Sequence, residues 1–282
     1  MRVGTKVTVR PFLRWAGGKC KFVHEIVSRL PALAPGRTYF EPFLGAGAVF
    51  LAYAPNKAIL SDLNPDLINV FQGVRDDVSK LVVTLQSIHY RDSEESYYRV
   101  RDRFNNGGVP CLQAARFIYL NQTSFNGIYR VNAIGRYNVP YGFKSHPNIP
   151  TKRELDAASR LLKNAEILLS DYRISTASAG EGDVVYLDPP YPPLNGTSYF
   201  THYTKERFSE DDQVSVAQTA EALRARGCFV MVTNADTALI RKLYSGWHIS
   251  EIMRPRWITS SRHKHRVIEL VITSCYAKEQ SC

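Results

Sequence analysis

Apolar residues along this chain follow two alternating patterns. Short runs of apolar and β-branched residues predict buried strands, and longer segments with apolar residues at helical spacing predict helices between them. The predicted strands are residues 38–41, 58–64, 166–171, 183–188, 228–234, 247–252 and 266–272. The predicted helices are residues 22–30, 112–120, 152–163, 210–226 and 237–244, and an apolar helix that follows Gly47. This alternation predicts an α/β fold with a Rossmann-like, doubly wound, mostly parallel sheet, and the last two strands predict an antiparallel hairpin at one edge.

The strand at residues 183–188 ends in an acid, two prolines and an aromatic residue. Proline cannot donate to a strand ladder, and Pro189 holds Asp188 in an extended conformation. Ligands of open α/β sheets bind at the carboxyl ends of strands, so Asp188 is predicted to lie at a binding site, with Tyr191 beside it. For an Asp-Pro pair alone, an ordinary turn is the alternative.

Two glycine-containing turns precede this strand. A Gly-Ala-Gly turn begins at Gly45, and Asp62, 17 residues later, lies at the tip of the second strand. Glycine lets the backbone approach a ligand, and an acid about 20 residues later is the usual partner of a ribose, so the pair indicates an adenosine-containing ligand. Upstream, a Gly-Gly-Lys turn ending at Lys19 resembles an anion-cradling helix start, and a tight turn with a solvated lysine is the alternative.

Residues 76–150 are rich in arginine, tyrosine and asparagine and are predicted to form an inserted domain between residues 1–75 and 151–282. The pairs Asn126-Gly127 and Ile134-Gly135 predict hairpin turns. Asparagine and arginine have planar polar groups that read base edges, while tyrosine and phenylalanine can stack or wedge between bases. The segment is therefore a candidate for nucleic-acid recognition, with a solvated surface hairpin as the alternative.

Charge and cysteine content narrow the class of protein. The 282 residues carry a net charge of +10, which suits a polyanionic partner. The basic cluster at residues 256–266 is a candidate phosphate contact or a solvated loop. Five cysteines without CxxC pairing indicate reduced thiols rather than disulfides or a zinc site. No apolar run approaches membrane-spanning length and residues 1–10 lack a signal-peptide core, so we expect a cytoplasmic protein.

Together these motifs resemble the Dam-type adenine-N6 DNA methyltransferases, with the cofactor motif first, target recognition in the middle and the DPPY motif last. The matching segments span nearly the whole chain: PFLRWAGGK, YFEPFLGAGAVF, ILSDLN, TSFNGIYRVNAIGRYNVPYG, DVVYLDPPY and RHKHRVIELVI. The resemblance implies a site-specific enzyme that transfers a methyl group from S-adenosylmethionine to the N6 amine of an adenine flipped out of duplex DNA. Because the sulfonium leaving group is already activated, neither a metal nor a covalent intermediate is needed.

The resemblance also implies site residues by motif position. The catalytic residues would be Asp188, Pro189, Pro190 and Tyr191. Asp188 and a main-chain carbonyl of the proline pair would accept hydrogen bonds from the amine, and Tyr191 would stack on the base. The cofactor-binding residues would be Trp15, Lys19, Phe43, Gly45, Gly47, Asp62, Asp171 and Asp188. Among these, Asp62 would hold the ribose and Asp171 would contact the cofactor adenine.

The DNA-binding residues implied in the same way are Arg14, Asn126, Ile128, Arg130, Pro140 and Lys144. Arg14 stands where the family usually has lysine. Arg130 and Pro140 match recognition residues of the family and make GATC the hypothesis for the target. Phe143 stands where some members carry arginine, which leaves the target sequence open.

Other interpretations are an amino methyltransferase acting on cytosine N4 or RNA adenine, a nucleic-acid-binding protein that has lost catalysis, and a nicotinamide dehydrogenase. Asp as the first letter of the DPPY motif favours adenine, and the absence of GxGxxG counts against the dehydrogenase. We expect a monomer that binds double-stranded DNA without a metal or a membrane. A restriction endonuclease is an open possibility as a partner in function, not in a complex.

Overall fold

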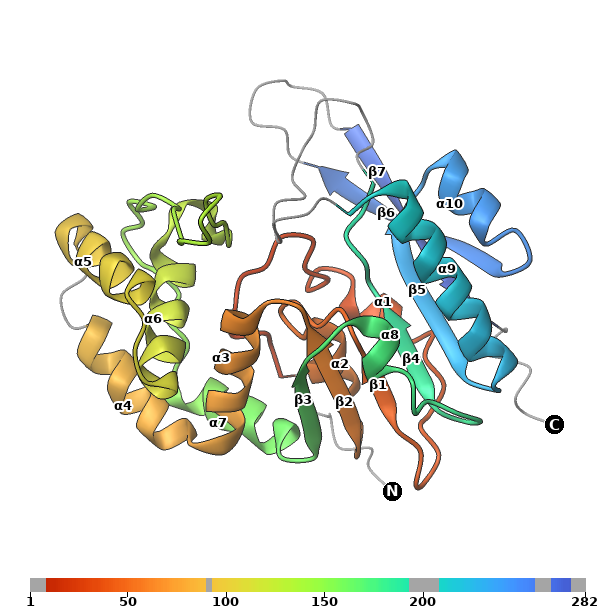
Figure 1. Cartoon of the computed structure of the whole chain (residues 1–282), viewed down its shortest axis with the longest axis horizontal. Coiled ribbons are helices and arrows are strands. Elements are labelled where there is room, and N and C mark those ends of the chain that lie inside the picture. The colour runs from red at the N-terminus through yellow and green to blue at the C-terminus, as the bar shows by residue number, and fades with distance from the viewer. Residues whose placement is uncertain (1–8, 90–92, 193–207, 257–264, 275–282) are drawn as a thin grey trace.

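The computed structural model describes residues 9–89, 93–192, 208–256 and 265–274 (Figure 1). Within these ranges, seven strands form one sheet in the order β3-β2-β1-β4-β5-β7-β6. The strands are β1 Tyr39–Glu41, β2 Ala58–Asp62, β3 Ala165–Leu169, β4 Val184–Leu187, β5 Phe229–Ala235, β6 His248–Arg256 and β7 His265–Thr273. Strands β1 to β5 run parallel, while β7 is antiparallel to β5 and β6. The predicted α/β sheet with an antiparallel edge hairpin is confirmed.

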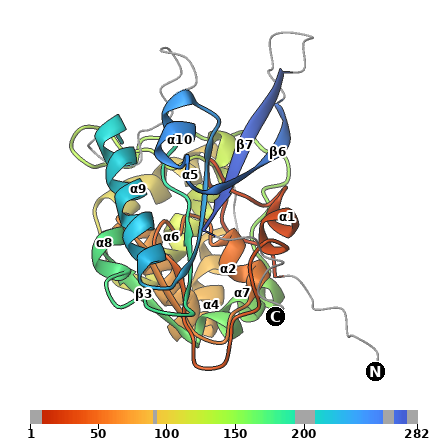
Figure 2. The ribbon, with the colours of Figure 1, turned by 90° about the vertical axis from the view of Figure 1, so that its right-hand side faces the viewer.

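Helices cover both faces of this sheet, with α9 on one side and α1 on the other (Figure 2). The helices are α1 Val23–Val27, α2 Ala48–Tyr53, α3 Pro65–Asp76, α4 Val78–His89, α5 Glu94–Asn105, α6 Pro110–Thr123, α7 Lys152–Leu162, α8 Tyr172–Ser175, α9 Glu210–Ala225 and α10 Ala238–Leu243. Every helix predicted from periodicity is present. Asp171, predicted as the end of a strand, instead caps the start of α8, because its side chain accepts a hydrogen bond from Arg173 N.

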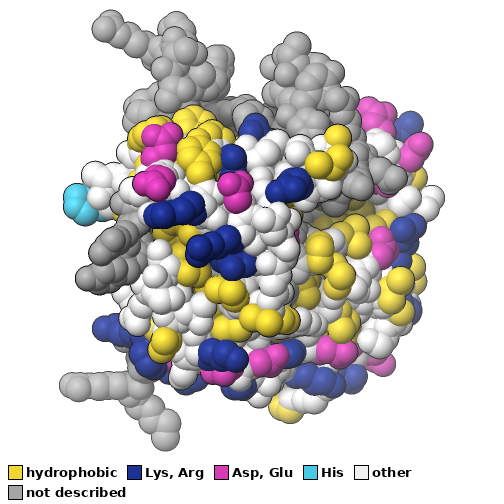
Figure 3. All heavy atoms as spheres, turned by 60° about the vertical axis from the view of Figure 1, so that its left-hand side comes forward, with side chains coloured by type: hydrophobic (Ala, Val, Ile, Leu, Met, Phe, Trp, Pro, Cys, Tyr) yellow, Lys and Arg dark blue, Asp and Glu magenta, His cyan; other side chains and the backbone are white. Residues whose placement is uncertain are grey.

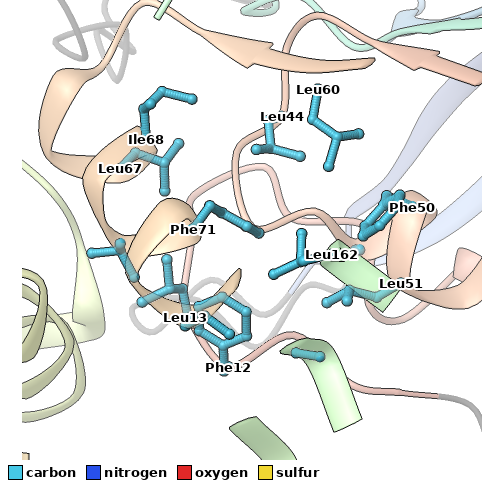
Figure 4. Packing of buried hydrophobic residues seen from close by; sticks show 14 of the residues in the cluster. Phe12, Leu13, Leu44, Phe50, Leu51, Leu60, Leu67, Ile68, Phe71 and Leu162 are labelled. Carbon is cyan, nitrogen blue, oxygen red and sulfur yellow. The ribbon is translucent and has the colours of Figure 1, made fainter. Parts of the chain in front are cut away.

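Strands β1, β4, β5 and β7 supply side chains to two hydrophobic cores. In β4, Val184 and Tyr186 face the larger core while Val185 and Leu187 face the core beneath α9, as the two-residue period of a strand requires. The larger core continues through α3 into α4, α5 and α6, and Figure 4 shows Phe71 of α3 beside Phe12 and Leu13 at its centre. The division into two domains stays a prediction.

The turn after β2 starts α3 at a defined residue. Asn64 is the N-cap, and its side-chain oxygen accepts hydrogen bonds from the main-chain nitrogens of Asp66 and Leu67. Such a cap contributes about 0.5–2 kcal/mol to helix stability. It also fixes the direction in which the chain leaves Asp62 at the end of β2.

The inserted region consists of α4, α5 and α6 followed by an extended segment that folds back on itself. The pairing includes isolated bridges between Ser124 and Tyr141 and between Val131 and Tyr137. Gly135, with φ of +81°, supports the turn, and its N–H donates to the main-chain oxygen of Asn132. The predicted Ile-Gly hairpin turn is therefore confirmed, and we call residues 124–142 the recognition hairpin.

The Asn-Gly pair does not form a hairpin turn, so that prediction is wrong. Asn126 and Gly127 lie in a short 3₁₀ turn, Phe125–Gly127, directly after α6. Phe125 N donates to the main-chain oxygen of Pro140, so the pair lies in one arm of the hairpin. Asn126 has φ of +54°, a left-handed conformation that asparagine tolerates, and it redirects the chain from helix to extended backbone.

The basic cluster and two of the five cysteines lie partly or wholly outside the described residues. Residues 257–264 of the basic cluster lie outside the described residues, as do Cys275 and Cys282. The described cysteines, Cys20, Cys111 and Cys228, carry free thiols. In the described part of the chain, no helix has the length and apolar character needed to cross a membrane, and His, Cys, Asp and Glu form no cluster of three or more suited to a metal ion.

Candidate active site

Asp188 follows β4, a central strand between β1 and β5. Its side chain is 19% exposed, and each of its carboxylate oxygens has a donor. The Thr233 hydroxyl on β5 donates to Oδ1 at 2.8 Å, and Lys19 Nζ lies 2.6 Å from Oδ2. Two partners and the restricted backbone before Pro189 thus fix the orientation of this carboxylate.

Lys19 is buried among acidic groups, with 3% of its surface exposed. Its ammonium donates to the main-chain oxygen of Gly17 at 2.9 Å and lies 3.5 Å from Glu269 Oε1, in addition to its contact with Asp188. The ammonium also lies 4.7 Å from the centroid of the Tyr191 ring, within cation–π range. The Gly-Gly-Lys turn therefore directs a cation to carboxylates of the sheet, and the alternative of a solvated lysine is wrong.

Tyr191 is held through its hydroxyl, which donates to Glu269 Oε1 at 2.7 Å. Burial and the nearby charges of Asp188 and Glu269 raise the pKa of Tyr191 well above its ordinary value. The phenol consequently stays protonated at neutral pH and remains a hydrogen-bond donor. Its ring is oriented by Glu269 at the hydroxyl and by Lys19 over the aromatic face.

Glu41 ends β1 close to this group and is 2% exposed. The hydroxyl of Tyr39 donates to its Oε2 at 2.7 Å. Burial raises the pKa of Glu41 to about 8; the nearby Asp188 adds to the rise, while the Tyr39 hydrogen bond and Lys19 oppose it. Glu41 therefore holds a proton at neutral pH, which leaves Lys19 to face the charges of Asp188 and Glu269.

Asp62 lies at the tip of β2, on the same edge of the sheet. Its Oδ2 accepts a hydrogen bond from Gly45 N at 3.1 Å, and its Oδ1 accepts one from Asn64 N at 3.0 Å. Burial raises the pKa of Asp62, and the hydrogen bonds from Gly45 and Asn64 lower it. The Gly-Ala-Gly turn and the acid predicted to work together are thus in direct contact.

Trp15 covers this turn. A Cβ at Gly45 would lie 2.9 Å from Trp15 Cδ1, so the absence of a side chain, together with φ of +47°, allows the indole to pack against the turn. The indole also stacks on Tyr129 of the recognition hairpin, at a centroid distance of 5.9 Å. Trp15 therefore lies between the glycine turn and the hairpin.

The remaining predicted cofactor residues have local partners. Phe43 stacks on Tyr172 with a centroid distance of 5.2 Å. Gly47 packs inward, since a Cβ there would lie 3.2 Å from the Phe71 ring. Asp171 is ion-paired with Arg173 at 2.8 Å, which lowers the pKa of Asp171. Their cofactor roles stay predictions.

Two predicted DNA-binding arginines are exposed and have defined neighbours. The Arg14 side chain lies against Gly127, where a Cβ would come within 2.6 Å of Arg14 Cδ. Arg130 donates from Nε to Asn138 Oδ1 at 2.8 Å and from Nη2 to the main-chain oxygen of Asn138 at 3.2 Å. Asn138 thereby restrains the guanidinium without burying it.

The other predicted DNA-binding residues lie in or beside the recognition hairpin. Asn126 and Pro140 are exposed and Ile128 is half-buried. Lys144 is half-buried and donates from Nζ to the main-chain oxygen of Gln122 at 2.5 Å. Lys and Arg side chains are spread over the face that brings the inserted helices forward, with Asp and Glu between them (Figure 3).

Comparison with known proteins identifies the family. The model of the D12 class N6 adenine-specific DNA methyltransferases matches residues 15–260. The chain belongs to this family. It is 40% identical to the type II methyltransferase M.MjaIII of Methanocaldococcus jannaschii over 94% of this chain and 98% of that protein. It is also 36% identical to the DNA adenine methylase of Escherichia coli K12 over 89% of this chain and 90% of that protein.

Membership of the D12 class makes the chain an enzyme that methylates adenine N6 in DNA. The acceptor atom and the class of reaction inferred from the sequence are confirmed. The nicotinamide dehydrogenase and the cytosine N4 or RNA acceptors are not supported by the family. The target sequence is a separate question, because the family description specifies the acceptor adenine and not the surrounding bases.

Several residues of this D12-class site were not predicted from the sequence. Glu269 and Thr233 touch Tyr191 and Asp188, and Glu41 lies beside them. The available signal for Glu269 was an acid between Ile268 and Leu270 in an otherwise apolar strand. An acid at such a position is buried only when it is paired or protonated.

Proposed function

We propose that this enzyme transfers the methyl group of S-adenosylmethionine to an adenine flipped out of duplex DNA, and that Asp188 accepts a hydrogen bond from the N6 amine. The observation that carries the proposal is the orientation of the Asp188 carboxylate, held by Lys19 at 2.6 Å and Thr233 at 2.8 Å beside Tyr191. A carboxylate fixed in this way can direct a weak nucleophile, because positioning supplies much of the acceleration in a transfer from an activated donor.

The residues at the ends of β1 and β2 fit the proposed cofactor. The two carboxylate oxygens of Asp62 accept hydrogen bonds from Gly45 N and Asn64 N. Each oxygen keeps a further lone pair that can accept a hydrogen bond from a ribose hydroxyl. The half-buried ring of Phe43, stacked on Tyr172, offers an apolar surface for an adenine ring. S-adenosylmethionine, when bound, supplies a methyl group on a positively charged sulfur that leaves as a neutral thioether.

The chain has two acceptors suited to the two N–H groups of the adenine amine. Each Asp188 oxygen retains a lone pair after the bonds to Lys19 and Thr233. Of the proline pair, Pro190 O already accepts from Gln213 Nε2 at 2.7 Å, which makes Pro189 O the proposed second acceptor. Hydrogen bonds to both acceptors would weaken conjugation of the nitrogen lone pair with the ring and direct it toward the methyl group.

The target adenine is buried in a duplex, so the base must leave the stack to reach Asp188. We propose that it stacks on Tyr191, whose ring orientation is set by Glu269 and Lys19. Methyl transfer leaves N6 positively charged, and N6 then releases one proton to solvent. The orienting role proposed for Asp188 therefore requires no net proton abstraction by this carboxylate.

For the target we propose GATC, with Arg130 as a reader of guanine. Arginine contacts guanine O6 and N7 with two parallel N–H groups, and Asn138 limits the orientations of the Arg130 guanidinium. Phe143 is 71% exposed and stands where some family members carry arginine. A GATC site that stays unmethylated after exhaustive reaction would refute this target.

We further propose that the enzyme acts as a cytoplasmic monomer without a metal, and that a restriction endonuclease with the same target would be a partner in function only. Light scattering at assay concentration tests the monomer. Full transfer in excess EDTA tests the absence of a metal requirement. A measured mass of two chains or more would contradict the monomer. Loss of transfer on chelation would contradict the absence of a metal requirement.

The experiment for the main proposal uses labelled S-adenosylmethionine and unmethylated plasmid DNA, followed by single-molecule sequencing to map modified adenines. We expect label in DNA at one short motif and no transfer by Asp188→Asn, which keeps the shape of the side chain but loses its charge. Asp211→Asn, an exposed acid on α9, is the matched control and should retain transfer. Near-normal turnover by Asp188→Asn would overturn the role of Asp188. No binding of S-adenosylmethionine would overturn the cofactor.

A further inference from the structure

Glu269 is a buried acid that neither the sequence motifs nor the family match assigns to the reaction. It is 3% exposed and lies on β7, paired with Ala235 at the end of β5. Burying an ionised carboxylate is costly unless it is paired and hydrogen-bonded. Its position in the sheet therefore calls for specific partners, and the partners it has belong to the active site.

The contacts of Glu269 close a ring of three side chains, Glu269, Tyr191 and Lys19, and Lys19 connects this ring to Asp188. Its Oε1 accepts from the Tyr191 hydroxyl at 2.7 Å and lies 3.5 Å from Lys19 Nζ. Lys19 in turn lies 2.6 Å from Asp188 Oδ2 and 4.7 Å from the centroid of the Tyr191 ring. The two ends of the DPPY segment are thus tethered, Asp188 by Lys19 and Tyr191 by Glu269, and the two tethers contact each other.

We propose that Glu269 is a positioning residue for methyl transfer. It fixes the positions of the Tyr191 ring and the Lys19 ammonium, so that the stacked base presents its N6 amine to the Asp188 carboxylate. This inference rests on the proposed roles of Asp188 and Tyr191. The Tyr191 hydroxyl keeps its proton at neutral pH, so its bond to Glu269 persists. Because Lys19 is shared by two carboxylates, losing one of them would let the ammonium move toward the other and shift Asp188.

Glu269→Gln is the test variant, because it keeps the volume and an acceptor for Tyr191 but removes the charge that faces Lys19. We expect kcat to fall about 10- to 100-fold, as for a displacement of about 1 Å in a reacting group, while the KM for DNA and the Kd for S-adenosylmethionine change less than about threefold. DNA with 2-aminopurine at the target position should show an altered fluorescence on binding, since the stacking surface has moved. A purely structural role would leave that signal unchanged.

The matched control is Glu251→Gln on the neighbouring strand β6, where the acid is exposed and ion-paired with Arg241. It makes the same chemical change in the same sheet and should keep wild-type kcat and fluorescence. Asp188→Asn, assayed in parallel, distinguishes the role of Glu269 from the role of Asp188. An active Asp188→Asn would refute the proposed role of Asp188, whereas an active Glu269→Gln beside an inactive Asp188→Asn would refute the role of Glu269 alone.

Tyr191→Phe removes the donor of the hydrogen bond between Tyr191 and Glu269. It tests the role of Glu269 even if Glu269→Gln fails to fold. It keeps the stacking ring and removes only the hydroxyl that Glu269 accepts. A fall in kcat of about fivefold or more with altered 2-aminopurine fluorescence supports the proposal. Wild-type kcat and fluorescence in Tyr191→Phe, or wild-type kcat in Glu269→Gln, would overturn it.

Discussion

The side-chain amide of Asn121 forms two hydrogen bonds with the main chain of Arg14, one through its oxygen and one through its nitrogen. Arg14 N donates to Oδ1 at 2.8 Å, and Nδ2 donates to Arg14 O at 2.8 Å, across a separation of 107 residues. Asn121 is 2% exposed and lies in the last turn of α6, directly before the recognition hairpin. The loop that carries Trp15 and Lys19 is therefore tied to the helix that leads into the hairpin.

Asn121→Ala should lower the free energy of unfolding by about 1–3 kcal/mol, since it leaves partly buried main-chain groups of Arg14 without these partners. It should also weaken S-adenosylmethionine binding, because Trp15 would be less well placed against Gly45. Denaturant unfolding and a cofactor titration measure the two effects. Asn148→Ala, at an exposed position, is the control. Unchanged cofactor affinity in a destabilised Asn121→Ala would show that the tie is structural only.

Lys19→Met should lower kcat by at least about 100-fold, because the carboxylate of Asp188 loses the partner that orients it. Removal of one partner of a buried ion pair costs about 3–5 kcal/mol, and the partial exposure of Asp188 places the expected loss at the lower end. Steady-state kinetics and denaturant unfolding give both values. The control is Lys21→Met, at an exposed lysine of the same loop, which should behave as wild type. Comparable kcat for the two variants would contradict the assignment.

Glu41 should make stability depend on pH. Its pKa is about 8 in the folded chain, against an ordinary value of 4.5, so between these values the folded state binds the additional proton. The free energy of unfolding should therefore fall as pH rises through this window, by at most about 1.4 kcal/mol per unit. The contribution is complete below pH 4.5 and lost above about pH 8.

Glu41→Gln keeps a neutral side chain of the same shape and should flatten this dependence. Denaturant unfolding of both proteins at about pH 5.5 and about pH 8.5 measures the difference in slope. Glu25→Gln, at an exposed acid of α1, should leave the slope unchanged. Parallel pH curves for wild type and Glu41→Gln would mean that Glu41 is ionised throughout.

Arg130→Ala should relax specificity at one base position and cost about 1–3 kcal/mol of discrimination there. The measurement is kcat/KM on duplexes that carry single base changes in the mapped target. Arg153→Ala, an exposed arginine of α7, should leave the pattern of preference intact. If Arg130→Ala lowers kcat/KM equally on all sequences, Arg130 contacts phosphate and does not read a base.

Much of the sheet and part of the site could be predicted because the signals are local. Apolar runs bounded by turn residues located β2, β4 and β5, and an acid at a strand tip located Asp62 and Asp188. The Asn126-Gly127 turn was mispredicted because the same dipeptide suits a hairpin turn and a 3₁₀ turn, and pairing of Phe125 with Pro140 decides between them.

By itself, the sequence determined the α/β alternation, the strand that presents Asp188 and the strand that ends in Asp62, because each depends on residues close along the chain or on one strand period. Only the tertiary structure decided that Lys19 faces carboxylates instead of solvent, that Glu269 holds Tyr191, and that burial raises the pKa of Glu41. The position of Glu269 depends on β7 lying between β5 and β6, and that of Lys19 depends on its loop lying against the sheet. Burial and charge pairing are properties of packed neighbours, and the chain order of those neighbours does not specify them.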